Sequence, residues 1–194
     1  MEICKKYKIK RFVFASSIYV HSQQGGFYRA SKQAAELYIE EYSKQHGLNY
    51  TILRFGTVYG PRADVRNNLS RIISGAIKTG TVKYRGTSRA VRRFIHVKDA
   101  AKASVDILKG KFVNKNILVT GKQVSKIKNL LFLISKCLKI KKKPQFENKT
   151  QQGHYNVNPY SYRPKKDKKY FAKSSISLNQ GIFELINEIK NEKK

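Results

Sequence analysis

A strand–helix–strand pattern between residues 12 and 55 limits the folds that this chain can adopt. Residues 12–16 are a short, continuous apolar run, which is typical of a strand buried on both faces of a sheet. Residues 28–46 place apolar side chains at helical spacing and stop before Gly47, a favoured residue just beyond a helix end. A second strand is expected over residues 49–55. Strands that alternate with helices predict an α/β protein with a parallel sheet.

The rest of the chain gives less regular signals of the same kind. Residues 141–175 are rich in lysine and polar residues, and we interpret them as a poorly ordered connection. Ser125 is expected to be the N-cap of the helix that follows it. The other expected elements are helices over residues 68–78, 97–108, 125–138 and 180–190, and strands over residues 81–84 and 115–120.

Tyr28 and Lys32 are the strongest candidates for catalytic residues. They lie four residues apart on the predicted helix and project from one face, so the ammonium can favour the ionised form of the phenol. A free phenol, with a pKa of about 10, is a poor base at neutral pH without such help. Ser17, at the end of the first strand, is expected to hold the reacting hydroxyl against the tyrosine. This trio is typical of an enzyme that oxidises an alcohol by abstracting its proton.

The sequence has no glycine-rich turn of the kind that binds a dinucleotide. Neither Gly-x-x-Gly-x-x-Gly nor Gly-x-Gly-x-x-Gly occurs in it, although such a turn lets backbone amides approach the pyrophosphate. The chain therefore carries acid–base residues without the motif that would hold an oxidant.

Four motifs follow one another in a definite order. They are Arg11-Phe12-Val13-Phe14-Ala15-Ser16-Ser17, Tyr28-x-x-x-Lys32, Leu53-Arg54-Phe55-Gly56-Thr57-Val58-Tyr59-Gly60-Pro61-Arg62 and Arg92-Arg93-Phe94-Ile95-His96-Val97-Lys98-Asp99. This order resembles the extended short-chain dehydrogenase/reductases, and most closely their NAD-dependent epimerase/dehydratase branch, which acts on nucleotide sugars. The resemblance covers residues 9–108 with specific motifs and extends weakly through residues 158–162.

The resemblance implies an incomplete Rossmann-like parallel sheet with a small C-terminal substrate-binding lobe. By the family's layout, the first mononucleotide-binding half of the Rossmann domain is expected to be missing, so the chain resembles a truncated enzyme. The expected parts are residues 1–66 for the C-terminal half of the Rossmann domain with the catalytic motif, 67–93 for a substrate-lobe segment, 94–120 for the return to the Rossmann domain, and 121–194 for the substrate lobe and C-terminal segment.

The resemblance also implies a reaction, the NAD-dependent 4-epimerisation of a nucleotide sugar through a 4-keto intermediate. Tyr28 would act as the base and Ser17 would hydrogen-bond the same sugar oxygen. Lys32 would contact the nicotinamide ribose, with Tyr28 and Ser16 also beside the NAD cofactor. The chain is expected to be inactive alone and to need a complementing N-terminal half. Members of the family commonly form homodimers.

Substrate contacts follow from the resemblance, and one departure narrows the reaction. Thr57 is assigned to the sugar and Arg92 to the diphosphate, whose oxygens suit a guanidinium. Where a dehydratase of this family carries an Asp-Glu pair for water elimination, the chain has Ile18-Tyr19. Neither side chain is an acid or base for that step at neutral pH, so epimerisation or simple oxidation is favoured over 4,6-dehydration. We interpret His96 as structural, hydrogen-bonded under its loop.

The formal net charge of +29 keeps other classes of function open. Such a field would assist capture of a nucleotide diphosphate, and it equally suits nucleic acid. The basic residues are dispersed along the sequence, which favours lysines on solvated faces. Two alternatives to an epimerase therefore remain, a non-catalytic truncated remnant and a basic nucleic-acid-binding protein.

Cysteine usage and hydropathy bound the cellular setting. Cys4 and Cys137 lie far apart with no paired ligand spacing, so no metal site is expected and the protein is expected to stay reduced. No apolar stretch is long enough for a bilayer, and the first residues lack the apolar core of a secretory signal. These features predict a cytoplasmic protein that does not bind a membrane.

Overall fold

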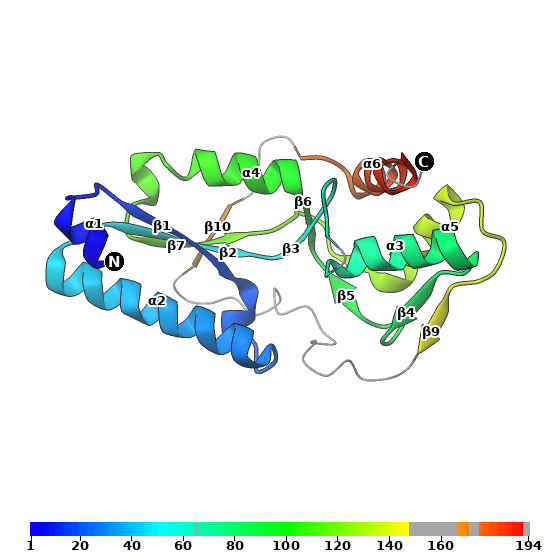
Figure 1. The fold of residues 1–194 in the computed structure, drawn as a ribbon, viewed down its shortest axis with the longest axis horizontal. Coiled ribbons are helices and arrows are strands. Elements are labelled where there is room, and N and C mark those ends of the chain that lie inside the picture. Colours follow the sequence, from blue (N-terminus) through cyan, green and yellow to red (C-terminus); the bar gives the residue numbers. More distant parts are fainter. Residues whose placement is uncertain (65, 148–166, 171–174, 192–194) are drawn as a thin grey trace.

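A computed structural model of the 194-residue chain describes residues 1–64, 66–147, 167–170 and 175–191. Its main feature is a four-stranded parallel sheet in the order β1-β2-β7-β10 (Figure 1). The strands are β1 (Phe12–Ser17), β2 (Tyr50–Phe55), β7 (Lys115–Val119) and β10 (Asp167–Tyr170). Helix α2 (Gly26–His46) covers one face of the sheet and α4 (Val97–Asp106) covers the other (Figure 1). The predicted α/β class with a parallel sheet is confirmed.

A second lobe lies beside the sheet and is built mainly from helices (Figure 1). Helices α3 (Asn68–Thr79), α5 (Ile127–Cys137) and α6 (Leu178–Asn191) bury their apolar faces in one shared core. The remaining helical elements are α1 (Glu2–Lys6) and the 3-10 turns Ile18–His21 and Gly110–Phe112. The remaining strands form three pairs, which are β3 (Thr57–Tyr59) with β6 (Phe94–His96), β4 (Lys83–Arg85) with β9 (Gln145–Glu147), and β5 (Val91–Arg92) with β8 (Ser125–Lys126). None of the helices in the described residues combines the length and apolar character needed to cross a bilayer.

The central strands explain why the first apolar runs predict the sheet correctly. Ile52 and Leu53 of β2 are 0% and 2% exposed, although successive side chains point to opposite faces. Leu53 packs with Ile117 and with Ala103 of α4 in a core on one side of the sheet. A strand covered by helices on both faces has no solvent side, so its sequence reads as continuous apolar rather than alternating.

The prediction that Ser125 caps a helix is wrong. Ser125 lies in β8, paired antiparallel with Arg92 of β5, and α5 begins two residues later at Ile127. Lys126 is the N-cap residue, and its side chain makes no capping hydrogen bond. Ser125 belongs to the paired strand and precedes the N-cap position by one residue, so its hydroxyl does not cap the helix.

The connection expected over residues 141–175 contains regular structure in its described part. Residues 145–147 form β9, which pairs with β4, and residues 167–170 form β10, which adds a fourth strand to the main sheet. Strand β10 thus lies in the sheet, although it falls within the range assigned to the substrate lobe. Residues 158–162, through which the family resemblance weakly extends, lie outside the described residues.

Asn67 fixes the start of α3 and the turn that leads into it. Its side-chain oxygen accepts hydrogen bonds from the backbone N–H groups of Leu69 and Ser70 at 3.1 and 3.2 Å, and its amide donates to Val58 O at 3.1 Å. Asn67→Ala is expected to lower the free energy of unfolding by about 1 kcal/mol, because a cap is lost. Urea denaturation measures this loss. Asn129→Ala, on the exposed side of α5, is the control and should cost nothing; an equal loss in both variants contradicts the assignment.

Candidate functional site

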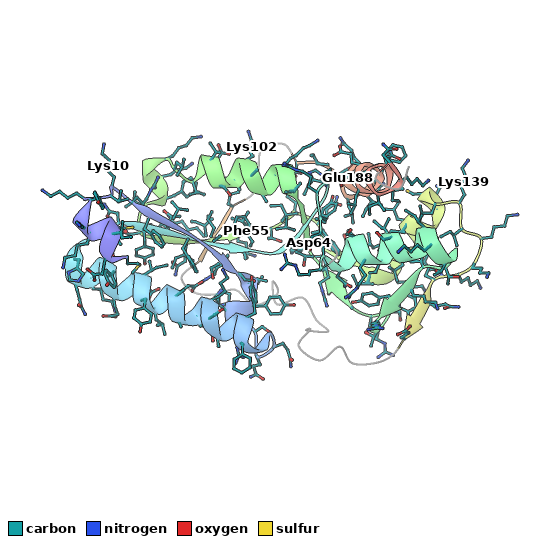
Figure 2. The ribbon with its side chains drawn as sticks, viewed as in Figure 1. Lys10, Phe55, Asp64, Lys102, Lys139 and Glu188 are labelled. Carbon is teal, nitrogen blue, oxygen red and sulfur yellow. The ribbon has the colours of Figure 1, made fainter. Side chains whose placement is uncertain are left out.

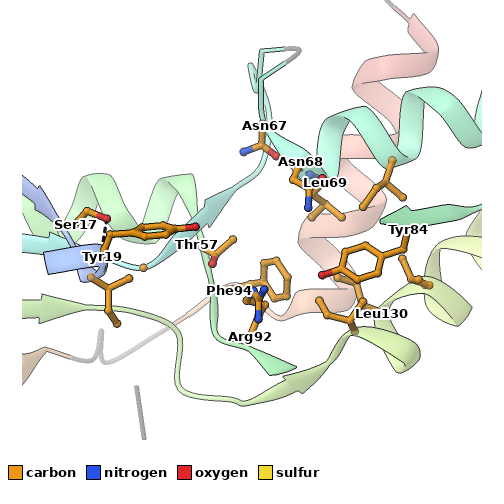
Figure 3. A pocket seen from close by; sticks show the side chains of 15 residues that line it. Ser17, Tyr19, Thr57, Asn67, Asn68, Leu69, Tyr84, Arg92, Phe94 and Leu130 are labelled. Carbon is orange, nitrogen blue, oxygen red and sulfur yellow. Dashed lines mark hydrogen bonds between the residues drawn. The ribbon is translucent and has the colours of Figure 1, made fainter. Parts of the chain in front are cut away.

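A cleft of about 770 Å³, partly open to solvent, lies between the sheet and the second lobe (Figure 3). Ser17 enters it from the end of β1, Thr57 from β3 and Arg92 from β5. The cleft thus adjoins the carboxyl ends of β1 and β2, where open α/β sheets usually bind their ligands. Three of the six candidate site residues from the sequence therefore share one cleft.

Ser17 is held in place by the turn that follows β1. It is buried, and its hydroxyl oxygen accepts a hydrogen bond from the backbone N–H of Tyr19 at 3.3 Å. A serine hydroxyl has one proton to donate besides its acceptor lone pairs. The bond to Tyr19 uses an acceptor lone pair, so the proton of Ser17 remains suited to donate to a ligand oxygen in the cleft.

Tyr28 and Lys32 lie side by side on α2, as their spacing predicts. The Lys32 ammonium is 5.8 Å from the centre of the Tyr28 ring and 4.9 Å from that of Phe14. It also donates a hydrogen bond to Ala15 O of β1 at 2.9 Å, two residues before Ser17. Lys32 therefore ties the helix that carries the tyrosine to the strand that carries the serine.

One aromatic ring separates Tyr28 from the cleft. Tyr28 is 52% exposed and does not line the cleft, but its ring meets the ring of Tyr19 edge to face, with centres 6.0 Å apart at 85°. Tyr19 does line the cleft, and its hydroxyl points toward Thr57 (Figure 3). The Tyr19 ring therefore stands between the cleft and the Tyr28–Lys32 pair. From the sequence, Tyr19 was noted only as a residue that replaces a dehydratase acid.

Ser16, predicted to contact the cofactor, faces away from the cleft. Neighbouring residues on a strand point to opposite faces, and Ser16 lies under α2, where its hydroxyl donates to Glu36. The same carboxylate forms a buried ion pair with Arg54 of β2 at 2.6 Å, and Arg54 also contacts His21 Nε2 at 3.0 Å. Ser16 is therefore part of a buried polar network that joins α2 to the first two strands.

Arg92 is almost fully buried where the two lobes meet. Its guanidinium lines the cleft and donates to Val91 O at 2.8 Å, while its backbone is held in the pairing of β5 with β8. In Figure 3 it lies beside Phe94, on the side toward which the Tyr84 hydroxyl points. A planar guanidinium in a largely desolvated cleft is a suitable group for binding a phosphate.

Tyr84 is a cleft residue that the sequence reasoning missed. It is 5% exposed, and burial raises the pKa of its phenol, although the charge of Arg92 acts in the opposite direction. The hydroxyl therefore stays protonated at neutral pH. Its neighbours Lys83 and Arg85 are exposed, and this alternation on a strand is the signal that could have identified Tyr84 as an inward-facing residue.

His96 has the structural role expected of it. The imidazole is 1% exposed, and its Nδ1 accepts a hydrogen bond from the backbone N–H of Lys98 at 3.3 Å, which caps α4. The other ring nitrogen, Nε2, lies 3.5 Å from a carboxylate oxygen of Glu184 on α6. His96 does not line the cleft, so its place is in the packing between α4 and α6.

Burial gives His96 a pH-dependent effect on stability. Desolvation lowers the pKa of His96 below its ordinary 6.5, and the opposing effects of Glu184 and Asp99 are smaller. As the pH falls, the His96 imidazole therefore binds a proton in the unfolded chain before it does so in the folded chain. The free energy of unfolding that is present above pH 6.5 should then decrease, by up to about 1.4 kcal/mol per pH unit.

His96→Asn removes the titrating group and keeps a side-chain acceptor for the cap. Urea denaturation at pH 7.5 and 5.5 should show a smaller loss of stability in the variant than in the natural chain. Equal losses in the two proteins would mean that His96 is not the group responsible.

The basic residues do not gather in the cleft. Lys10, Lys102 and Lys139 are exposed and project from widely separated places on the surface (Figure 2). Within the described residues, no three His, Cys, Asp or Glu side chains come together as a metal site would require. Among the described residues that line the cleft, the positive charge is that of Arg92.

The chain is similar in sequence and in structure to several known proteins. A Methanocaldococcus jannaschii protein, provisionally named a UDP-glucose 4-epimerase, is 28% identical over 211 residues, which cover 100% of this chain and 68% of that protein. The structure of Thermotoga maritima UDP-glucose 4-epimerase with UDP-glucose matches with a TM-score of 0.79 at 21% identity, over 100% of this chain and 67% of that one. The structure of Bacillus cereus UDP-glucuronic acid 4-epimerase with UDP-glucuronic acid and NAD matches with a TM-score of 0.82 at 22% identity, over 98% and 65%.

The chain thus spans about two-thirds of the length of these three proteins. At such identities the two solved structures show a shared fold. The family model for the NAD dependent epimerase/dehydratase family matches residues 1–121, more than half of the sequence. The chain therefore belongs to the NAD-dependent epimerase/dehydratase family.

Proposed function

We propose that this chain is the catalytic and substrate-binding part of a nucleotide-sugar 4-epimerase. The observation that carries the proposal is the meeting of Ser17, Thr57 and Arg92 in one cleft that borders the Tyr28–Lys32 pair. The ends of the cleft differ in chemistry. Hydroxyl groups at the Ser17 end suit a sugar, and a guanidinium beyond them suits a diphosphate.

The proposed roles of the residues follow from their side chains. Tyr28, as the general base, removes the proton from the C4 hydroxyl of the sugar, and Ser17 donates a hydrogen bond to the same oxygen. Thr57 holds the sugar and Arg92 holds the diphosphate. The sugar becomes a 4-keto intermediate, which turns over in the cleft and is reduced on its other face to give the epimer. Because Tyr28 lies behind Tyr19, a bound sugar must reach past the Tyr19 ring to meet it.

The described residues fit one end of NAD. Lys32 uses one of its three N–H donors for Ala15 O, which leaves two for the hydroxyls of the nicotinamide ribose. Bound NAD would accept the C4 hydride and return it. The Ser16 hydroxyl already donates to Glu36, and the sequence has no glycine-rich turn for the pyrophosphate.

We further propose that activity depends on a complementing Rossmann half, and that residues 1–66 and 94–120 serve the cofactor while 67–93 and most of 121–194 serve the substrate. Ile18 and Tyr19 occupy the place of a dehydratase acid pair, which favours epimerisation over water elimination. We propose that the reaction takes place in the cytoplasm.

The test is conversion of UDP-glucose to its 4-epimer with NAD+ present. The chain alone should convert none, and the chain mixed with a separately produced, glycine-rich Rossmann half should convert it. Conversion by the chain alone would refute the dependence on a second half. No conversion by a folded pair that binds both ligands would refute the proposed reaction.

A further inference from the structure

We propose that Tyr84 is a further substrate-binding residue, whose hydroxyl donates a hydrogen bond to the diphosphate beside Arg92. This inference rests on the proposed nucleotide-sugar substrate and adds a contact that neither the motifs nor the comparisons assign. It starts from the direction of the side chain, because the Tyr84 hydroxyl points into the cleft toward Arg92 (Figure 3).

The ring of Tyr84 is fixed so that only its hydroxyl end serves the cleft. One edge meets the ring of Phe146, with centres 6.3 Å apart at 77°. A Cβ at Gly86 would lie 2.7 Å from Tyr84 Cε1, and the backbone there has a φ of +147°. Only glycine combines that conformation with room for the ring. The local chain is therefore built around Tyr84 in this orientation.

A tyrosine that served packing alone would need no polar atom at this end. Leu69, Leu130 and Leu131 line the same part of the cleft and already supply apolar contact. The Tyr84 hydroxyl instead faces the open cleft near the Arg92 guanidinium, where a polar ligand group can reach it. Since the phenol is protonated at neutral pH and the guanidinium carries only donors, both groups favour an acceptor that is an anion.

The two donors come from separate strands of the second lobe. Tyr84 is in β4 and Arg92 is in β5, and the segment between them includes Gly86. Binding a phosphate between them would hold the two ends of this segment together. We therefore expect loss of the Tyr84 hydroxyl to weaken binding of the diphosphate itself, whichever sugar is attached.

The experiment compares calorimetric titrations of the natural chain and Tyr84→Phe with UDP, UDP-glucose and inorganic diphosphate at moderate salt. The variant removes one oxygen and should weaken all three by a similar factor of about tenfold. Tyr59→Phe is the matched control, because Tyr59 is equally buried and does not line the cleft. It should bind all three ligands like the natural chain.

Three outcomes would overturn the inference. Unchanged binding by Tyr84→Phe would mean that the hydroxyl does not touch the ligand. Weaker binding of UDP and UDP-glucose with unchanged inorganic diphosphate would place the contact on the base or ribose instead. If the natural, folded chain bound none of the ligands, the proposed substrate class would fail together with the inference, whereas the first two outcomes would leave that class intact.

Discussion

Glu36→Ala is expected to lower the free energy of unfolding by about 3–5 kcal/mol, a large part of the stability of a domain of this size. Glu36 is 6% exposed and Arg54 is 8% exposed, and two of the Arg54 nitrogens donate to the two oxygens of the Glu36 carboxylate at 3.1 and 2.6 Å. Removing the carboxylate leaves a guanidinium buried with its main counter-ion gone. It also removes the acceptor of the Ser16 hydroxyl.

Urea denaturation of three variants separates this cost from a general effect of changing α2. Glu41→Ala makes the same substitution at an exposed position of the helix and should cost less than about 1 kcal/mol. The double variant Glu36→Leu with Arg54→Met replaces the pair by apolar groups and should recover much of the loss. A double variant less stable than Glu36→Ala would contradict the view that the unpaired charge dominates.

Tyr28→Phe is expected to reduce 4-epimerisation by about 10²–10⁴-fold, the usual contribution of a general base. The substitution removes only the phenolic oxygen. It keeps the ring that contacts Tyr19 and lies beside Lys32, so folding and binding of the nucleotide sugar should not change. The assay is the conversion of UDP-glucose by the chain with its complementing Rossmann half.

Tyr38→Phe makes the same change on the same helix, at an exposed tyrosine with no lysine four residues later. It should retain full activity. A Tyr28→Phe variant that binds substrate normally and converts it at the natural rate would remove Tyr28 from the mechanism. The remaining candidate base would then have to lie within the cleft itself.

Local patterns in the sequence were sufficient to predict three of the four strands of the main sheet, β1, β2 and β7, and the helices that cover it, but not β10. A strand buried on both faces leaves a continuous apolar run, as in β1 and β2, and an amphipathic helix leaves apolar residues at helical spacing, as in α2. Each pattern can be recognised in the sequence alone. The two-residue strands β5 and β8 are too short to leave a recognisable pattern in the sequence. Their pairing explains both the position of Arg92 and the failure of Ser125 as a cap.

The candidate site was predictable only where a motif named its residues. Ser17, Thr57 and Arg92 come from three separate strands, and the family motifs single out all three although only the fold brings them into one cleft. The roles of Tyr19, Glu36 and Tyr84 depend on which face each side chain takes and on what lies opposite. Those contacts join residues far apart in the sequence, and no local spacing encodes them.

The central claim is that the cleft between Ser17 and Arg92 binds a nucleotide sugar, and calorimetric titration of the chain with UDP-glucose tests it most directly. Moderate salt suppresses nonspecific attraction by the +29 charge. Arg89→Ala, at an exposed position outside the cleft, is the control for loss of one charge. We predict saturable binding that Arg92→Ala weakens by at least about tenfold and Arg89→Ala leaves unchanged. No binding by the folded chain, or equal weakening by the two variants, would contradict the claim.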